Sequence, residues 1–388
     1  MIFVARVVKR FAKILQTVIR RVSMRYQRCS RCIMDNASDP TIRFDSNGVC
    51  NYCTKALSEI NTTTYFPNEE GQRRLEKMLD EIRRVNKDKD YDCLMGISGG
   101  LDSAYLAYLG YKWGLRIMAV HIDDGFDTDV SKENIKKLCK AAQIELKVIK
   151  PDAYQFNELT KAYMRAGVPN LAIPQDNILF AFLYDIAEKS RIKYFLSGGN
   201  FALESILQQG NTYNAMDIVN LKDINKRFGH APIDKLKFIS SYKKYLMMKT
   251  GKLVNLRPLN YINYNREQAL LDLKEFCDFK YYGRKHLENV LTAFLQLYWL
   301  PNKFGVDKRT SHLSSMIVSG QMTREEALKE IEKPIVDEEL MREYIAIIKE
   351  KMGISDDEFE AIMASQIHQH DEYKIDKLSI LLRKIISR

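Results

Sequence analysis

The side chains best suited to chemistry lie in one short string between an apolar run and a helical pattern. The string is Ser98-Gly99-Gly100-Leu101-Asp102-Ser103, and it follows the apolar residues 93–97. Because a helical pattern begins at once over residues 104–109, the string is expected to join a buried strand to the first turn of a helix. That turn carries unpaired N–H groups and partial positive charge, which makes it a site for phosphate.

Each residue type in the string suits a phosphate ligand. The glycines let the backbone turn sharply beside an anion, the serines add hydroxyl donors, and Asp102 suits Mg²⁺ held on phosphates. The expected contacts are Gly96, Ser98, Gly99, Gly100, Leu101, Asp102 and Ser103. A bare glycine pair would favour an ordinary tight turn, and the standard loop G-x-x-x-x-G-K-[ST] is absent. The full string resembles the PP-loop of the ATP pyrophosphatases, which cleave ATP to AMP and pyrophosphate and activate a carbonyl oxygen as its adenylate.

Four cysteines form a second constellation, with the spacing C-x2-C-x17-C-x2-C over Cys29, Cys32, Cys50 and Cys53. Each close pair aims two thiolates at one point, which predicts a structural zinc site with no open coordination position. An iron–sulfur cluster and two coincidental pairs are the alternatives. The chain has seven cysteines, and this odd number argues against a disulfide framework and for a reducing, cytoplasmic compartment.

Alternating strand and helix patterns follow the first loop. Apolar strands are expected over 115–122, 144–149 and 194–196, with helices over 132–142, 156–164 and 176–188 between them. The alternation predicts an α/β fold with a doubly wound, mostly parallel sheet, which the resemblance makes one of PP-loop type. The expected divisions are a leader over 1–23, the zinc module over 24–60, the PP-loop domain over 61–260 and a mainly helical C-terminal region over 261–388.

Polar residues follow two of these strands, at the sheet edge where open α/β sheets bind ligands. His121 and Asp123 stand at the end of the 115–122 strand, and a second glycine turn follows the 194–196 strand. The alternatives are that His121 is a core residue and that the glycine turn after the 194–196 strand is a simple turn. The PP-loop resemblance implies that His121 and Asp123 flank the adenosine and that the second turn lies on the pyrophosphate side. The residues of that turn are Gly198, Gly199, Asn200 and, nearby, Glu204.

The net charge of +10 is concentrated at the N-terminus, where residues 1–23 hold six basic residues and no acid. The rest of the chain is close to neutral, so no nucleic-acid partner is expected. The leader has one apolar and one basic helical face. Three alternatives remain for the leader. It lies in the surface of an anionic membrane, it docks on the body of the protein or on a partner, or it is a dispensable extension before Met24. No window reaches the ~20 unbroken apolar residues that span a bilayer.

The order of motifs along residues 25–350 resembles the N-acetyl sugar amidotransferase family of WbpG and PseA type, from bacterial surface-polysaccharide synthesis. The cysteine module precedes the PP-loop, residues 174–177 read Pro-Gln-Asp-Asn, and polar clusters follow at 281–288 and 302–312. Arg284 stands where a second glycine is expected. The resemblance implies substrate contacts and further catalytic residues in these segments. The substrate residues are Asp176, Lys285, His286 and His312, and the catalytic residues are Asp102, Ser103, Asn200, Glu204, Lys308 and Arg309.

The family implies a specific reaction. ATP adenylates the carbonyl oxygen of an N-acetyl group on a nucleotide-linked sugar, and ammonia then displaces AMP to give an acetamidine. The implied cofactors are ATP and Mg²⁺, with zinc in the cysteine module. Because Cys93, Cys139 and Cys277 lie in strand or helical patterns, none is expected to act as a glutaminase nucleophile. A separate glutaminase subunit is therefore the expected source of ammonia.

Two other functions compete with this interpretation. A tRNA-modifying PP-loop enzyme, for thiolation or lysidine-type ligation, is the first, because zinc modules also accompany those enzymes. The near-neutral body of the chain and the absence of an obvious sulfur-carrying cysteine near the loop weigh against it. A nucleic-acid-binding module without catalysis is the second. It would explain the cysteine module and the basic leader but not the ATP loop.

Overall fold

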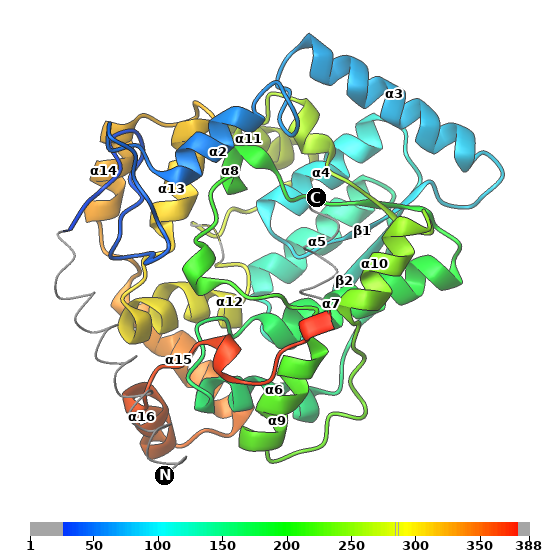
Figure 1. Ribbon diagram of the computed structural model, residues 1–388. Coiled ribbons are helices and arrows are strands. Elements are labelled where there is room, and N and C mark those ends of the chain that lie inside the picture. Colours follow the sequence, from blue (N-terminus) through cyan, green and yellow to red (C-terminus); the bar gives the residue numbers. More distant parts are fainter. Residues whose placement is uncertain (1–25, 284, 286, 379–388) are drawn as a thin grey trace.

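The computed structural model describes residues 26–283, 285 and 287–378, and within them a five-stranded parallel sheet lies at the centre (Figure 1). The strand order is β3-β2-β1-β4-β5, and every neighbouring pair is parallel. The strands are β1 (Cys93–Gly96), β2 (Ile117–Ile122), β3 (Glu145–Ile149), β4 (Tyr194–Leu196) and β5 (Val254–Leu256). The order reverses between β2 and β4, on either side of β1, so the PP-loop string after β1 leaves the sheet at the point where ligands bind in such folds.

Helices cover both faces of the sheet, because its central strands are apolar on both sides. The cluster that contains Met95 and Ala119 packs against helices of one face, and the cluster that contains Leu94 and Val120 packs against those of the other. The first face carries α3 (Glu69–Val85), α4 (Leu101–Lys112), α5 (Asp129–Ala141) and α11 (Arg266–Cys277). The second face carries α7 (Ile173–Lys189) and α10 (Ser241–Lys249). The expected doubly wound α/β fold is confirmed.

A third apolar core belongs to a helical body beside the sheet, built around the fully buried Trp299 and Phe294. Its helices are α6 (Ala153–Arg165), α9 (Ile218–Phe228), α12 (Val290–Phe294), the π-helix η3 (Leu295–Phe304), α15 (Glu338–Met352) and α16 (Asp356–Ala364). Lys303, from one of the polar clusters of the sequence, donates to the carbonyl oxygens of Ile362, Met363 and Ser365. That lysine therefore caps the end of α16.

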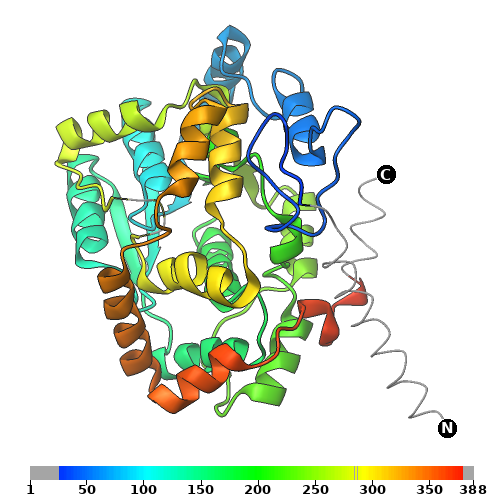
Figure 2. The same ribbon diagram turned by 90° about the vertical axis from the view of Figure 1, so that its left-hand side faces the viewer.

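The cysteine module lies beside two helices from far along the chain, α13 (Arg309–Val318) and α14 (Arg324–Glu332), as both views show (Figures 1 and 2). The guanidinium of Arg324 donates to the carbonyl oxygens of Cys29 and Cys32, and the N–H of Ile33 donates to Ser314 Oγ at 3.3 Å. The module ends in α2 (Asn51–Glu59), whose side chains join the core of the first sheet face. The module is thus tied to the helices that follow the sheet.

The short elements complete the chain: α8 (Phe201–Glu204), η1 (Gln209–Asn211), η2 (Pro258–Tyr261) and η4 (His370–Glu372). The expected helices over 132–142, 156–164 and 176–188 appear with their ends moved by a few residues, and the strand over 194–196 appears unchanged. A capping box of Thr323 and Glu326 begins α14. The leader over 1–23 lies outside the described residues. Within the described ranges, no helix has the length and apolar character needed to cross a membrane.

Candidate active site

The PP-loop string forms a tight turn that begins α4 with its N–H groups at one end of a cavity. Gly99 adopts a φ of 77°, and a Cβ there would lie 2.2 Å from Ser131 Oγ, so the turn requires glycine. Ser98 Oγ and Ser103 Oγ lie 3.2 Å apart, and Ser98 Oγ accepts from the N–H of Gly100. These contacts fix two hydroxyls and the first-turn N–H groups on one side, as an anion cradle requires.

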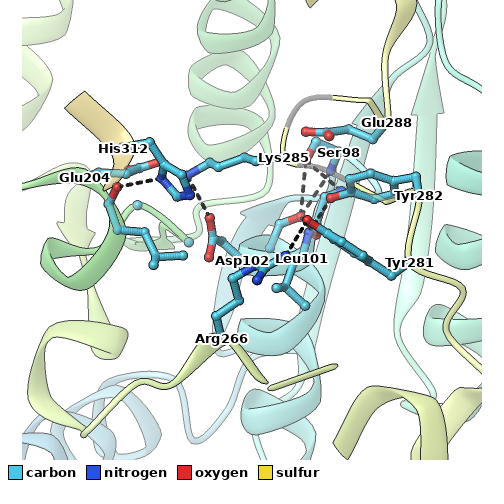
Figure 3. Close-up of a pocket in the computed structure, with 15 residues that line it drawn as sticks. Ser98, Leu101, Asp102, Glu204, Arg266, Tyr281, Tyr282, Lys285, Glu288 and His312 are labelled. Carbon is cyan, nitrogen blue, oxygen red and sulfur yellow. Dashed lines mark hydrogen bonds and ion pairs between the residues drawn. The ribbon is translucent and has the colours of Figure 1, made fainter. Parts of the chain in front are cut away.

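Asp102 and Glu204 lie on either side of one ammonium group (Figure 3). Lys285 Nζ lies 3.3 Å from Asp102 Oδ2 and 3.1 Å from Glu204 Oε1. The phenol of Tyr264 donates to the other oxygen of Asp102 at 2.6 Å. Burial lowers the pKa of Lys285, but the two carboxylates outweigh it and raise that pKa above its ordinary value. Two carboxylate oxygens that hold a cation between them are also the donor type that Mg²⁺ prefers.

The second glycine turn, after β4, packs against the first. A Cβ on Gly198 would lie 3.0 Å from the N–H nitrogen of Ser103, so only glycine permits this approach of the two turns. Gly198, Gly199 and Glu204 line the same cavity as the PP-loop. Asn200 is 2% exposed and caps α8, where its Oδ1 accepts from the N–H of Leu203. Asn200 is not among the residues that line this cavity.

The cavity at the PP-loop has a volume of about 220 Å³ and is closed by side chains from the second half of the chain. Figure 3 shows the labelled side chains converging on it from both halves. Its remaining lining residues are Ser98, Gly100, Leu101, Leu203, Arg266, Tyr281, Tyr282, Glu288 and His312. The phenol oxygen of Tyr282 accepts from the N–H of Leu101 at 3.1 Å. This N–H group belongs to the first turn of α4 and suits a phosphate oxygen, but here a protein oxygen occupies it.

His312 lies where three cavities meet, because it lines the phosphate cavity and both of its neighbours. Its Nδ1 lies 3.2 Å from the carbonyl oxygen of Leu203, which can only accept, so Nδ1 carries the proton. Burial and the charge of Lys285 lower the pKa of His312 to about 4. The ring is therefore neutral near pH 7 and leaves the lone pair of Nε2 available as a hydrogen-bond and proton acceptor.

A second cavity, of about 310 Å³, lies across the carboxyl ends of β1, β2 and β4 and shares Ser98 and Gly198 with the first. His121 lines it, but both ring nitrogens are engaged, by the carbonyl oxygen of Ile97 at 2.8 Å and by Asp127 Oδ2 at 3.0 Å. A carbonyl oxygen and a carboxylate oxygen both accept hydrogen bonds, so this pair of contacts favours the protonated ring. Burial lowers the pKa of His121, but Asp127 outweighs it and raises that pKa. His121 thus forms part of the wall, with its ring held in place by contacts at both nitrogens.

Asp123 and Asp176 occupy different positions around this cavity. Asp123 lies outside its lining, where it accepts from the N–H of Gly125 and pairs with Lys150 Nζ at 3.2 Å. Asp176, in the first turn of α7, lines the cavity, as does Phe180 of the same helix. Burial raises the pKa of Asp176 to about 6. The cavity joins an apolar wall to a few polar groups, which suits a nucleoside.

Lys308 and Arg309 are neighbours in the sequence, but their side chains have different surroundings. Arg309 binds Asp307 through Nε and Nη2 and donates to main-chain carbonyl oxygens of residues 330–334. Its guanidinium therefore holds the end of α14, although it also borders two cavities. Lys308 lines a cavity of about 190 Å³ next to the phosphate cavity. His286 lies outside the described residues, so its predicted role stays a prediction.

The four predicted cysteines gather at one buried point, and their Sγ atoms all lie within 4.8 Å of one another. Cys32 Sγ and Cys50 Sγ are 3.8 Å apart, which suits thiolates that share one tetrahedral ion at about 2.3 Å. The donor set is compatible with zinc or with iron–sulfur chemistry. The other three cysteines are buried in β1, α5 and α11, away from the cavities.

Several residues of the site carried no signal in the sequence analysis. Tyr264 and Arg266 belong to no motif, because they reach Asp102 and the cavity from a loop and a helix start about 160 positions away. Tyr282 and Glu288 fall inside the polar cluster 281–288, in which only Lys285 and His286 were assigned roles from the sequence. Local patterns report an element and its faces, and they do not report which distant side chain packs against it.

Two family models match parts of the chain. Residues 92–200 match the model of the queuosine biosynthesis protein QueC, and residues 288–386 match the C-terminal domain of LPS biosynthesis proteins of WbpG type. The first match spans β1 to the second glycine turn. The second includes η3 and α13, and with them Glu288 and His312 of the phosphate-cavity lining.

Two curated proteins are similar to the chain in sequence. An uncharacterized protein of Methanocaldococcus jannaschii is 20% identical over 318 residues, which is 81% of this chain and 97% of that protein. The tRNA-5-methyluridine(54) 2-sulfurtransferase of Pyrococcus horikoshii is 28% identical over 109 residues, or 26% of this chain and 34% of that protein.

Solved structures also resemble it, at low TM-scores. The NMN synthetase of Francisella tularensis is 15% identical, with a TM-score of 0.35, over 73% of this chain and 95% of that chain. The U34-tRNA thiolase NcsA of Methanococcus maripaludis, solved with its [4Fe-4S] cluster, is 18% identical with a TM-score of 0.35, over 77% and 88% of the two chains. Taken with the phosphate turn after β1, the two family matches identify the chain as a PP-loop ATP-using enzyme with a WbpG-like C-terminal domain.

Proposed function

We propose that the chain is the synthetase subunit of an ATP-dependent amidotransferase that converts an N-acetyl group of a nucleotide-activated sugar into an acetamidino group. The carbonyl oxygen attacks the α-phosphorus of ATP, the bond to the β-phosphate breaks, and pyrophosphate leaves. Ammonia then attacks the activated carbon, the bond from that carbon to oxygen breaks, and AMP leaves. The product serves LPS O-antigen or a related surface glycan.

One observation carries this proposal: residues of the PP-loop and of the WbpG-like C-terminal segment line cavities that share walls. Asp102 comes from the PP-loop, whereas His312 comes from α13, within the segment that matches proteins of LPS biosynthesis. The cavity across the strand ends suits the adenosine, the 220 Å³ cavity suits the phosphates, and two further cavities beside His312 leave room for an acceptor. The acceptor carbonyl would thus meet ATP beside His312.

The residues of the cavity suit distinct tasks in this reaction. The N–H groups and hydroxyls of residues 98–103 bind the leaving pyrophosphate, which concentrates positive partial charge where negative charge develops. Asp102 and Glu204 would hold Mg²⁺, which neutralises phosphate charge when bound. Lys285, released from the two carboxylates, can pair with a phosphate oxygen. The Nε2 lone pair of His312 accepts the proton that ammonia loses as it forms the new C–N bond.

The proposal includes partners that the chain requires for this chemistry. Cys93, Cys139 and Cys277 are buried in regular elements, so ammonia comes from a separate glutaminase subunit. Zinc in the cysteine module would hold the loop of residues 26–50 against α13 and α14. We place the enzyme in the cytoplasm, with residues 1–23 as a candidate contact to the inner face of the membrane.

The test is to incubate the protein with Mg-ATP, an ammonium salt and UDP- or CMP-linked N-acetyl sugars, and to measure AMP. We expect AMP and pyrophosphate in equal amounts, both dependent on the sugar, together with a product that is 1 Da lighter than the acceptor because NH replaces O. AMP formation with none of these sugars would count against the acceptor class. Omission of ammonium should stop amidine formation.

A tRNA-modifying function is the second candidate, because 109 residues of the chain are 28% identical to a tRNA sulfurtransferase. Thiolation needs a sulfur carrier, and in the part of the chain that the structure describes no cysteine lines the cavities around the PP-loop. The discriminating measurement is tRNA-dependent AMP formation with a sulfide source. A positive result there, with no response to sugars, would replace the proposal above.

A further inference from the structure

The cavity that Lys308 lines has the character of a site for a sugar with a charged group. It lies between α8, η3 and the start of α13 and has a volume of about 190 Å³. Leu203, Ile206 and Leu297 provide apolar wall, whereas Gln296 and Ser311 provide polar groups. This mixture suits the CH faces, methyl groups and hydroxyls of a pyranose ring.

This cavity adjoins the phosphate cavity and opens to solvent. The two share Leu203, Glu204, Lys285 and His312 as walls. At the outer end, Leu207 is 56% exposed, so a ligand that fills the cavity can extend beyond it. A molecule held here would present one end to the reacting phosphate and the other to solvent.

Lys308 is the cation of this cavity that remains available for a ligand. Arg309 is occupied by Asp307 and by main-chain carbonyl oxygens. Lys285 is held by two carboxylates, and once Mg²⁺ takes these carboxylates it is assigned to a phosphate oxygen of ATP. Within the described residues, the ammonium of Lys308 forms no hydrogen bond or ion pair. A half-buried ammonium without a partner is costly, and an anionic ligand would relieve that cost.

The surroundings of Lys308 agree with this role. Burial lowers its pKa to about 8, and the buried carboxylate of Asp39 in the cysteine module opposes that shift only in part. Asp39 is itself engaged, because Oδ1 accepts from Thr41 and Oδ2 from the phenol of Tyr52 at 2.5 Å. The other charged groups that border the cavity are Glu204, Lys285 and Arg309, all of them paired, and His312 is neutral.

We propose that this cavity is the acceptor subsite and that Lys308 binds an oxyanion of the acceptor, either a phosphate of its nucleotide diphosphate or a carboxylate on its sugar ring. The proposal rests on the function proposed above, since it places the acceptor relative to the ATP phosphates. It makes the charge of the acceptor, and not only its acetamido group, a requirement for binding.

The test compares Lys308→Met and Lys308→Arg with the wild type and with Lys189→Met, which removes an exposed lysine of α7 that pairs with Asp185. Binding is measured by calorimetry with Mg²⁺ and a non-hydrolysable ATP analogue present throughout. The probes are UDP-N-acetylglucosamine, its counterpart with a carboxylate at C6, N-acetylglucosamine 1-phosphate and free N-acetylglucosamine. The first three carry an oxyanion, and the contrast between them separates phosphate from carboxylate as its source.

We expect Lys308→Met to weaken the binding of at least one anionic probe by roughly 10- to 100-fold. Free N-acetylglucosamine and the ATP analogue should bind as to the wild type, and Lys189→Met should change nothing. Affinity for the anionic probe should fall as pH rises through about 8 in the wild type, because the free ammonium titrates there. Lys308→Arg should remove this pH dependence, since a guanidinium stays charged.

The outcomes separate this proposal from the proposed function. Equal binding of the anionic probes by wild type and Lys308→Met would overturn the subsite, even if the sugars support AMP formation. An equal loss for free N-acetylglucosamine would also overturn it, since that result indicates a structural effect. If the wild type makes no AMP with any sugar and still binds the anions through Lys308, the subsite stands and the amidotransferase proposal falls.

Discussion

Replacement of Asp102 by asparagine is the sharpest test of the phosphate site. The carboxylate has two tasks, because Oδ1 accepts from Tyr264 at 2.6 Å and Oδ2 faces Lys285 at 3.3 Å. Asparagine keeps the size and one acceptor but removes the charge. Lys285 keeps Glu204 as a partner, so the free energy of unfolding should fall by only about 1–2 kcal/mol.

The effect on activity should be larger than the effect on stability. Loss of one preorganised group that stabilises charge in the transition state costs about 3–4 kcal/mol, which corresponds to a roughly 10²- to 10³-fold fall in AMP release. Because Asp102 would hold Mg²⁺ on the phosphates, the concentration of Mg²⁺ needed for half-maximal rate should also rise. The assay measures AMP and pyrophosphate release over a Mg²⁺ titration, beside a thermal melt.

Asp272→Asn is the matched control. Asp272 accepts from the phenol of Tyr105 at 3.0 Å, as Asp102 does from Tyr264, but it lies on α11 outside the cavity lining. It should lose a similar amount of stability and keep wild-type turnover. If Asp102→Asn releases AMP at the wild-type rate, or if both variants lose activity equally, Asp102 does not act on Mg-ATP.

Four further outcomes follow from the structure. His121→Gln should lower the free energy of unfolding more at pH 6 than at pH 9. A histidine with a raised pKa stabilises the fold below about pH 6.5 and loses that contribution as pH rises through its pKa in the folded state. Denaturant titrations at the two pH values measure the difference. Cys32→Ser should abolish bound metal and cost about 3 kcal/mol or more, and metal analysis of the wild type should find zinc rather than visible iron–sulfur absorbance. Tyr282→Phe frees the N–H of Leu101, so the KM for ATP should stay unchanged or fall up to about fivefold, and a rise would show that the phenol assists binding. Arg309→Lys should destabilise the protein by about 2–3 kcal/mol in a thermal melt while AMP release per folded molecule stays within about twofold, whereas a large loss of turnover would restore a catalytic role.

Local sequence patterns predicted the elements that hold the site. The apolar runs became parallel strands, and the string after β1 became a glycine turn at the helix start, because burial and backbone conformation depend on residues that are close in sequence. The four-cysteine spacing predicted a buried cluster for the same reason, since each pair is one turn. These features need no knowledge of distant partners.

The roles of individual polar residues depended on such partners, and the sequence did not contain them locally. Arg309 was predicted to be catalytic, and in the structure its guanidinium binds Asp307 and the end of α14. Asn200 was expected to contact ligand and caps α8, although asparagine before a short helix is itself a capping signal. His121 was expected at the adenosine, and the acceptors on both sides of its ring depend on β1 and on the loop after β2.

The cysteine module contacts α13, and the start of α13 borders the cavity that we propose for the acceptor. The N–H of Ile33 donates to Ser314, and Arg324 at the start of α14 donates to Cys29 and Cys32. Lys308 and His312 stand at the beginning of the same α13, so a loosened module would move the acceptor groups while the glycine turn of residues 98–103 stays anchored in the sheet. Loss of metal in Cys32→Ser should therefore impair use of the acceptor before it impairs binding of ATP, because the two ligands rest on different parts of the fold.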